Sequence, residues 1–293
     1  MSEIKRRRHF PALIAAVLII ALPSFTGAAQ EPGAEDALVK ESGGAEAPDK
    51  GTSDEELAKK LQNPIAFLIS VPFQNNYEYR LGPQKKGFRY TMKLQPVIPK
   101  RINKDWNIIF RPITPVINQN FAVGRSSQGG LSDIITEIFF SPNKLGPGGL
   151  MWGAGPVLLF PTATNRYLGN GKWGMGPTFV ALKQKKGVTA GILAYQLWSF
   201  AGQEDRDSVR STYLQPFVSY TTKRAFTYFC QSESSYNGKS GQWTFPLIGG
   251  VSQLFTFMHH KMSLALAGIY YSVAPSDAPK WGTRLTFTLL FPE

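Results

Sequence analysis

The strongest constraint on the fold is the pattern of residues 280–291, close to the end of the chain. Apolar side chains alternate there with more polar ones, and the apolar set is Leu285, Phe287, Leu289 and Phe291. Successive side chains of a β-strand point to opposite faces, so this period of two predicts a strand with one apolar face. Strands of this kind build either a soluble sandwich or a barrel.

In spacing, this stretch resembles the closing strand of bacterial outer-membrane barrels, which the barrel insertion machinery reads. The matching positions are Lys280, Gly282, Leu285, Phe287 and Phe291. The pattern departs from the usual one at its end, where Pro292 and Glu293 follow the aromatic residue. A terminal strand of a soluble sandwich also alternates, so the other end of the chain is needed to decide.

Residues 1–29 have the layout of a secretory signal peptide. A basic stretch at 5–8 precedes an apolar run at 12–22, and small residues at 27–29 offer a cleavage site before Gln30. Such an order of basic, apolar and small residues is typical of export signals. The apolar run is too short for a membrane anchor, which needs about 20 apolar residues.

Composition limits what the exported chain can be. No later stretch is long and apolar enough for a spanning helix, which excludes a helical inner-membrane protein. The single cysteine, Cys230, cannot form an internal disulfide. Stability in an oxidising compartment must therefore come from another source, and a closed, hydrogen-bonded barrel supplies one.

Charge divides the chain sharply. Residues 30–56 carry nine acidic residues and two lysines among Gly, Ala and Pro, which predicts a disordered acidic linker. Residues 57–293 carry 26 Lys and Arg against ten acids, spread along the whole segment. An exported protein meets little nucleic acid, so we expect no nucleic-acid partner. A short helix is expected over 53–61, with Ser53 or Asp54 as N-cap.

The remainder divides into segments of the length and alternation of barrel strands. We expect an all-β fold, an antiparallel transmembrane β-barrel of about twelve strands within residues 57–293. The strands are predicted near 67–77, 87–98, 105–116, 131–141, 149–160, 174–183, 187–199, 211–221, 225–233, 242–252, 262–273 and 280–291. With both termini in the periplasm, most long connections fall outside the cell. The exceptions are 142–148 and 253–261, which are long for periplasmic turns.

Five tryptophans lie within a few residues of predicted strand ends, where amphipathic rings favour the headgroup zone of a membrane. They are Trp152, Trp173, Trp198, Trp243 and Trp281. Tryptophan at the edge of a soluble core is the alternative. These positions predict aromatic contacts with outer-membrane lipid.

Prolines inside the predicted strands oppose a simple barrel, because proline gives no hydrogen bond to the ladder. They are Pro72, Pro96, Pro112, Pro156, Pro177, Pro216 and Pro246. We expect them at bulges, near the interfaces, or where strands are broken.

Several motifs, in order, resemble a bacterial family of outer-membrane transporters often mislabelled "neuromedin U" and related to the phenol-degradation meta-pathway barrels. The matching segments are 69–76, 94–99, 152–156, 161–164, 171–178, 198–200, 215–220 and 291–292. The resemblance covers roughly residues 57–293. It implies a barrel in the bacterial outer membrane, a transport role, and intrastrand prolines as a family trait. The resemblance does not identify any functional-site residues in this sequence.

An outer-membrane enzyme is the competing class. Barrel hydrolases place a histidine beside a serine or an acid near the mouth, and after residue 29 the sequence has only His259 and His260. Both fall on a predicted periplasmic connection. Metal ligation lacks further ligands at suitable spacing. We therefore expect no enzymatic activity, no catalytic residues, no metal and no cofactor.

For transport, about twelve strands should leave a narrow passage or a filled lumen, since eight are plugged and sixteen form a wide channel. The predicted inward set includes Arg89, Lys93, Arg111 and Arg284. One hypothesis is a narrow, positively lined pore for small anionic or polar solutes. The alternative is that these cations pair with acids, such as Asp133 or Glu137, and stiffen a closed wall.

Two further functions remain open. Inward Ile109, Phe217 and Phe229 would suit uptake of small hydrophobic or aromatic compounds through an apolar lumen with a lateral exit. A barrel that conducts nothing is favoured if the helix at 57–62 folds into the lumen.

Overall fold

The computed structural model describes residues 53–122 and 126–291. The predicted signal peptide, and the acidic linker up to residue 52, lie outside the described residues. The first element is the helix α2 (Asp54–Leu61), whose N-cap Ser53 accepts a hydrogen bond from the backbone of Glu56. The short helix predicted over 53–61 is therefore present, and residues 54–56, which were also counted in the linker 30–56, belong to it.

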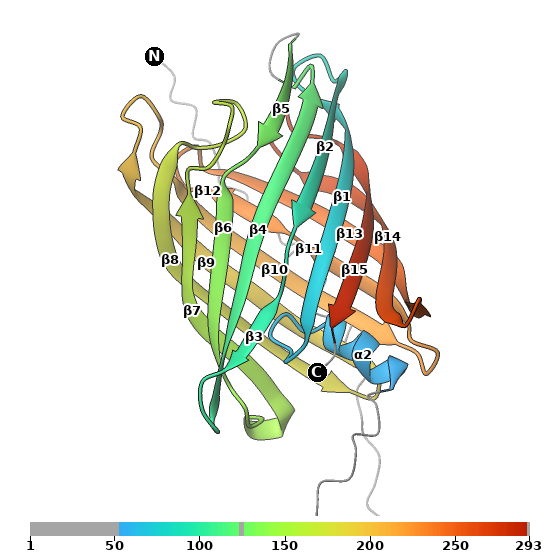
Figure 1. The fold of residues 1–293 in the computed structure, drawn as a ribbon. Coiled ribbons are helices and arrows are strands. Elements are labelled where there is room, and N and C mark those ends of the chain that lie inside the picture. Colours follow the sequence, from blue (N-terminus) through green and yellow to red (C-terminus); the bar gives the residue numbers. More distant parts are fainter. Residues whose placement is uncertain (1–52, 123–125, 292–293) are drawn as a thin grey trace, which may run out of the picture. The chain divides into compact units, whose positions relative to one another are not determined.

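Fifteen strands follow and form one closed antiparallel sheet (Figure 1). Three of them are short pieces that continue a neighbour, so the barrel wall has 12 strands. The strands are β1 (Ile69–Leu81), β2 (Gly87–Leu94), β3 (Ile98–Arg101), β4 (Trp106–Asn120), β5 (Ser127–Leu131), β6 (Ile134–Pro142), β7 (Leu150–Phe160), β8 (Lys172–Lys185), β9 (Val188–Gly202), β10 (Arg210–Thr221), β11 (Phe226–Ser232), β12 (Ser234–Asn237), β13 (Gln242–Phe257), β14 (His260–Val273) and β15 (Trp281–Phe291).

Consecutive wall strands pair all the way round, and the pairing of the last strand with the first closes the barrel. β15 pairs with β1 along its whole length, from Tyr79↔Trp281 to Ile69↔Phe291, and β9 pairs with β10. The alternating segment 280–291 is therefore the closing strand, as its pattern predicted. The predicted fold class, an all-β antiparallel barrel of about twelve strands, is confirmed. Among the described residues, no helix is both long and apolar enough to cross a membrane.

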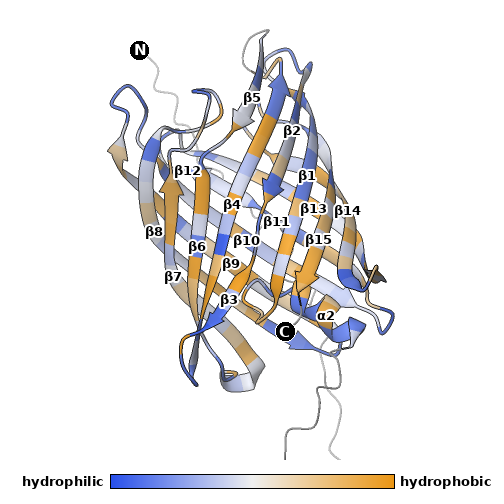
Figure 2. Ribbon diagram, viewed as in Figure 1, coloured by the Kyte–Doolittle hydropathy of each residue, from blue (hydrophilic) through white to orange (hydrophobic). Residues whose placement is uncertain are grey.

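The connections differ between the two ends of the barrel. The end that holds α2, here called the α2 end, has the connections 102–105, 143–149, 186–187, 222–225 and 258–259. The opposite loop end has 82–86, 121–126, 161–171, 203–209, 238–241 and 274–280. Figure 2 shows polar residues gathered in these connections, while apolar and polar positions alternate along the strands.

One predicted connection is wrong. Residues 253–261 belong almost entirely to strands, because β13 extends to Phe257 and β14 begins at His260. Only Met258 and His259 form the turn, with φ of 45° and 67°. Tight hairpin turns need positive φ at both central residues and usually contain Gly or Asn. Neither residue type occurs at this turn, so no local turn signal predicted it.

The prolines lie where the hydrogen-bond ladder is interrupted, as predicted. Pro96 falls between β2 and β3, and Pro72 and Pro112 flank that gap on β1 and β4. The gap between β11 and β12 is likewise flanked by Pro216 and Pro246.

Pro156 and Pro177 face each other across β7 and β8, and the ladders beyond them are also interrupted. At all of these gaps except that at Pro246, the pairing resumes in the same register. With the exception of the β13–β14 ladder at Pro246, these interruptions therefore remove hydrogen bonds without turning the inward side chains outward.

Candidate functional site

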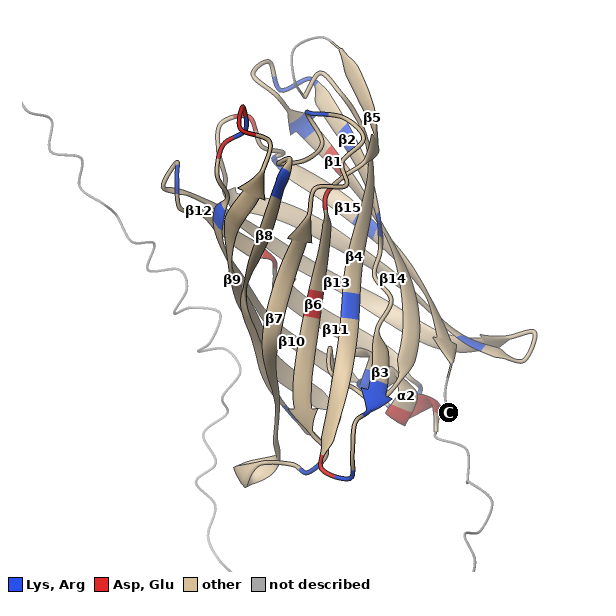
Figure 3. Ribbon diagram, turned by 60° about the vertical axis from the view of Figure 1, so that its left-hand side comes forward, with Lys and Arg blue, Asp and Glu red and all other residues tan. Residues whose placement is uncertain are grey.

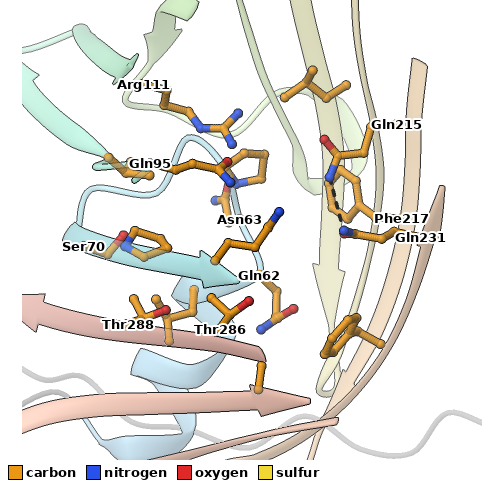
Figure 4. A pocket seen from close by; sticks show the side chains of 18 of the residues that line it. Gln62, Asn63, Ser70, Gln95, Arg111, Gln215, Phe217, Gln231, Thr286 and Thr288 are labelled. Atoms are coloured by element: carbon orange, nitrogen blue, oxygen red, sulfur yellow. Dashed lines mark hydrogen bonds between the residues drawn. The ribbon is translucent and has the colours of Figure 1, made fainter. Parts of the chain in front are cut away.

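The barrel encloses a cavity of about 380 Å³ next to the α2 end. Figure 4 shows Gln62 and Asn63, from the segment after α2, among the side chains that line it, with the hydrogen-bonded Gln215 and Gln231 on the opposite wall. Polar lining comes mainly from Gln74, Gln95, Gln215, Gln231, Thr286 and Thr288. Apolar lining comes mainly from Leu68, Val97, Ile113, Leu193, Phe217 and Phe229. The interior is therefore hollow and mixed in character.

A second cavity of about 740 Å³ opens towards the loop end. It is lined by polar residues of the connection 203–209 and of the strands beside it, among them Ser211, Ser235 and Thr244. Ile135 and Tyr195 line both cavities. The cavity next to the α2 end is here called the inner cavity and the cavity at the loop end the outer cavity, and the two adjoin at the level of these two residues.

Charged side chains gather close to this level. Glu233, in the gap between β11 and β12, pairs with Arg284 of β15 through N–O distances of 2.5 and 3.1 Å. Lys93 of β2 lies 3.6 Å from the same carboxylate. Arg284 is only 6% exposed, and its Nε donates to Asn76 at 2.7 Å. The Arg284 guanidinium thus has a hydrogen-bond partner at each nitrogen.

Two other ion pairs join residues that face each other on adjacent strands. Arg111 of β4 pairs with Glu137 of β6 at 2.8 Å, and their strands show as neighbouring blue and red segments in Figure 3. Arg89 of β2 lies 3.9 Å from Glu78 of β1 and donates to Gln119 at 2.8 Å. Both pairs tie neighbouring strands of the wall together.

A chain of neutral polar groups connects the charged residues to the aromatic ones. Tyr213 donates to Gln215 at 3.1 Å, Gln215 donates to Gln231 at 3.3 Å, and Gln231 donates to Glu233 at 3.1 Å. The ring of Tyr213 stacks on that of Tyr195, with centroids 4.7 Å apart. Such a network fixes the side chains at the junction of the two cavities.

The segment 57–68 lies inside the α2 end of the barrel. Leu57 and Ala58 of α2 pack with Ala225, Leu254 and other wall residues in a buried apolar cluster. Ile65 packs in a second cluster with Ile109, Phe139, Val180, Leu182 and Leu193.

Polar contacts hold the same helix to the rim of the barrel. Lys261 of β14 lies 2.5 Å from Asp54, and Gln184 of β8 donates to the backbone oxygen of Lys59 at 2.8 Å. The helix and the residues after it therefore narrow the α2 end.

Of the predicted lumen residues, Lys93, Arg111 and Arg284 line the inner cavity. Arg89 lines neither cavity and is paired with Glu78 and Gln119. Each of these cations is paired with an acid, as in the alternative hypothesis in which such pairs stiffen a closed wall. Asp133, offered as a partner, instead accepts hydrogen bonds from the backbone of Ala163 and Asn170.

Sequence reasoning missed two of the acids, Glu78 and Glu233. Both lie at the edges of predicted strands, where the period of two was not extended far enough. Continuing that alternation past Asn76 or past Gln231 would have placed both acids on the inward face.

The five predicted interface tryptophans lie on strands with outward-facing rings at two levels. Trp173, Trp198, Trp243 and Trp281 are near the loop end, and Trp152 is near the α2 end, where its ring contacts Trp106. Large apolar side chains between these levels are exposed, among them Phe110, Phe179, Ile192, Leu264, Leu266 and Leu285. An apolar band between two aromatic girdles is the surface that a membrane barrel presents to lipid.

In the predicted insertion signal, Lys280 directly precedes β15, Gly282 and the polar set face the lumen, and Leu285, Phe287 and Phe291 face outward. His259 and His260 lie in and beside the turn at the α2 end. Within residues 53–122 and 126–291, no group of three or more His, Cys, Asp or Glu side chains could hold a metal ion.

A closed antiparallel barrel with an apolar outer band and a hollow, partly polar interior has the fold of bacterial outer-membrane channels. No protein-family model matches the chain, and no curated protein matches its sequence.

The structure is similar to a solved outer membrane channel from Pseudomonas putida F1. The TM-score is 0.59 at 12% identity, and the match covers 76% of this chain and 94% of the other. The NanC porin also matches, with a TM-score of 0.45 at 12% identity over 77% of this chain and 100% of the other.

Proposed function

We propose that the protein is an outer-membrane channel that admits small polar solutes through a narrow lumen, with a weak preference for anions. The observation that carries the proposal is the pair of cavities inside the barrel, which share Ile135 and Tyr195 in their linings. A barrel that served only as a wall would fill this space with side chains.

The charges near the junction favour a weak preference over a strong one. Four cations, Arg89, Lys93, Arg111 and Arg284, are set against three acids, Glu78, Glu137 and Glu233. The excess is one positive charge among these seven groups. Charged side chains lining a narrow passage set ion selectivity through the local field.

The orientation and setting form part of the proposal. The loop end faces outside the cell, the α2 end faces the periplasm, and the apolar band lies in the outer-membrane lipid. The closing strand is the segment that the insertion machinery reads. The histidines lie at the α2 end, away from the outer cavity, which supports a channel over an enzyme.

The test is planar-bilayer conductance of the purified, folded protein with a salt gradient to report ion preference. We expect small discrete steps and a reversal potential slightly on the anion side. Replacing both Arg89 and Lys93 with Glu turns the excess of one positive charge into an excess of three negative charges, and the preference should reverse. Unchanged selectivity in this double variant would contradict the proposal that these two cations set the field along the passage.

A second function, uptake of small hydrophobic or aromatic compounds, has one observation in its favour. Phe217 and Phe229 line the inner cavity beside Leu68 and Leu193. Ile109, the third residue considered for this role, is instead buried against Ile65. A folded, inserted protein that shows no ion steps but speeds the entry of a neutral aromatic compound into vesicles would favour this function.

A further inference from the structure

Glu233 differs from the other lumen acids because its ion-pair partners lie on distant strands of the barrel wall. Glu78 and Glu137 pair with residues directly opposite on adjacent strands. Between Glu233 and Arg284 lie the strands β13 and β14, and Lys93 is two strands further, on β2. Among the ion pairs of the described residues, those of Glu233 therefore reach across part of the lumen instead of along the wall.

The surroundings of the Arg284 guanidinium are those of a preorganised carboxylate-binding site. Its two terminal nitrogens contact both oxygens of the Glu233 carboxylate, and Nε is held by Asn76. Lys93 adds a second positive charge at 3.6 Å. A planar guanidinium that meets a carboxylate in this two-point manner is the usual way in which proteins recognise free carboxylates.

Glu233 also stands in the path between the two cavities. Along its own strand pair, the preceding inward residue, Gln231, lines the inner cavity, and the following one, Ser235, lines the outer cavity. The gap between β11 and β12, flanked by Pro216 and Pro246, places this acid at that level. A solute that moves from one cavity to the other along this part of the wall passes the Glu233 carboxylate.

We propose that Arg284 and Lys93 form a binding site for the carboxylate of a small permeating organic acid, and that Glu233 occupies this site as an internal substitute when no solute is bound. This proposal rests on the proposed channel function and specifies its substrate class. When the solute carboxylate takes the place of Glu233, the two cations keep an anionic partner. The exchange therefore avoids leaving a buried charge unpaired.

The binding site can be tested without any conduction. In the Glu233→Ala variant, the site is vacant and the two cations lose their partner, so the folded barrel should be less heat-stable than the wild type. Acetate should restore much of the lost stability, whereas chloride at the same concentration should not. The double variant E233A/R284Q should show no response to acetate.

The matched control is Glu137→Ala, which also removes one lumen carboxylate from an arginine. Glu137 is only 1% exposed and pairs along the wall, so acetate should not reach Arg111 in the same way. Equal rescue of both alanine variants by acetate, or no rescue of E233A beyond that by chloride, would overturn the proposal.

Conductance measurements test whether Glu233 obstructs the passage of solutes when it occupies the site. Glu233→Gln removes the charge and keeps the size, and we expect single-channel conductance to rise about twofold or more, with a stronger anion preference. Glu137→Gln should change conductance less. Acetate should raise the conductance of the wild type and not that of E233Q.

The two proposals can fail separately. If the folded proteins never conduct but acetate still stabilises E233A, the proposed channel function is wrong and the proposed carboxylate-binding site stands. If the protein conducts and its conductance changes neither in E233Q nor with acetate, the proposed role of Glu233 is wrong and the proposed channel function stands.

Discussion

At the scale of single residues, Gly176 shows how closely neighbouring backbones approach beside the paired prolines. A Cβ atom at this position would lie 1.8 Å from the backbone oxygen of Gln196 on β9. The backbone must shift to accept any side chain, because the clashing atom is not a flexible one. The gap that Pro177 leaves in the ladder permits this approach only while residue 176 is glycine.

Gly176→Ala should therefore destabilise the barrel by about 1–3 kcal/mol, the usual cost of overpacking. The measurement is urea unfolding in lipid vesicles, followed by tryptophan fluorescence. Gly249→Ala is the control, because a Cβ there meets nothing within 4 Å. Equal stability of the two variants would show that β8 and β9 can separate at little cost.

At the scale of elements, α2 and the residues after it close the α2 end without belonging to the wall. The helix is docked through Leu57, which is 2% exposed, while Asp54 and Lys261 form an ion pair at its first turn. The ladder of the barrel runs from β1 round to β15 and includes no residue of the helix. Undocking α2 should therefore leave the barrel folded.

Leu57→Asp should release the helix, because a buried unpaired carboxylate is strongly unfavourable. We expect larger conductance steps, with the heat-modifiable gel shift of the folded barrel unchanged. Glu56→Gln, at an exposed position of the same helix, should behave as the wild type. Conductance equal to that of the wild type in Leu57→Asp would show that the solute path does not pass the helix.

At the scale of the whole molecule, the outer surface carries its apolar residues in a band between two levels of tryptophan. Leu266, near the middle of β14, is 59% exposed, and its cross-strand neighbour Leu285 is 38% exposed. In water, replacing an exposed leucine with a polar residue changes stability little. In a bilayer, the same change brings a charge into hydrocarbon.

Leu266→Arg should thus cost about 2–4 kcal/mol of folding free energy in lipid vesicles. Met258→Arg is the control, because Met258 is 74% exposed in the turn at the α2 end, outside the apolar band. A cost that is the same at both positions would contradict the membrane position of the band.

The sequence alone determined the wall of the barrel. Period-two alternation, as in 280–291, depends only on neighbouring residues, and together with segment length it predicted twelve wall strands and placed Lys93, Arg111 and Arg284 on the inward face. The prolines were also predicted to lie at interruptions, because a missing N–H is a local property.

Only the tertiary structure decided how the lumen is filled. Glu233 meets Arg284 and Lys93 because closure of the barrel brings three separate strands around one space, and no local pattern encodes that meeting. The docking of α2 against Ala225 and Leu254 depends likewise on residues far apart in the chain. A strand's faces follow from adjacent residues, whereas partners across a lumen follow from the register and the curvature of the whole sheet.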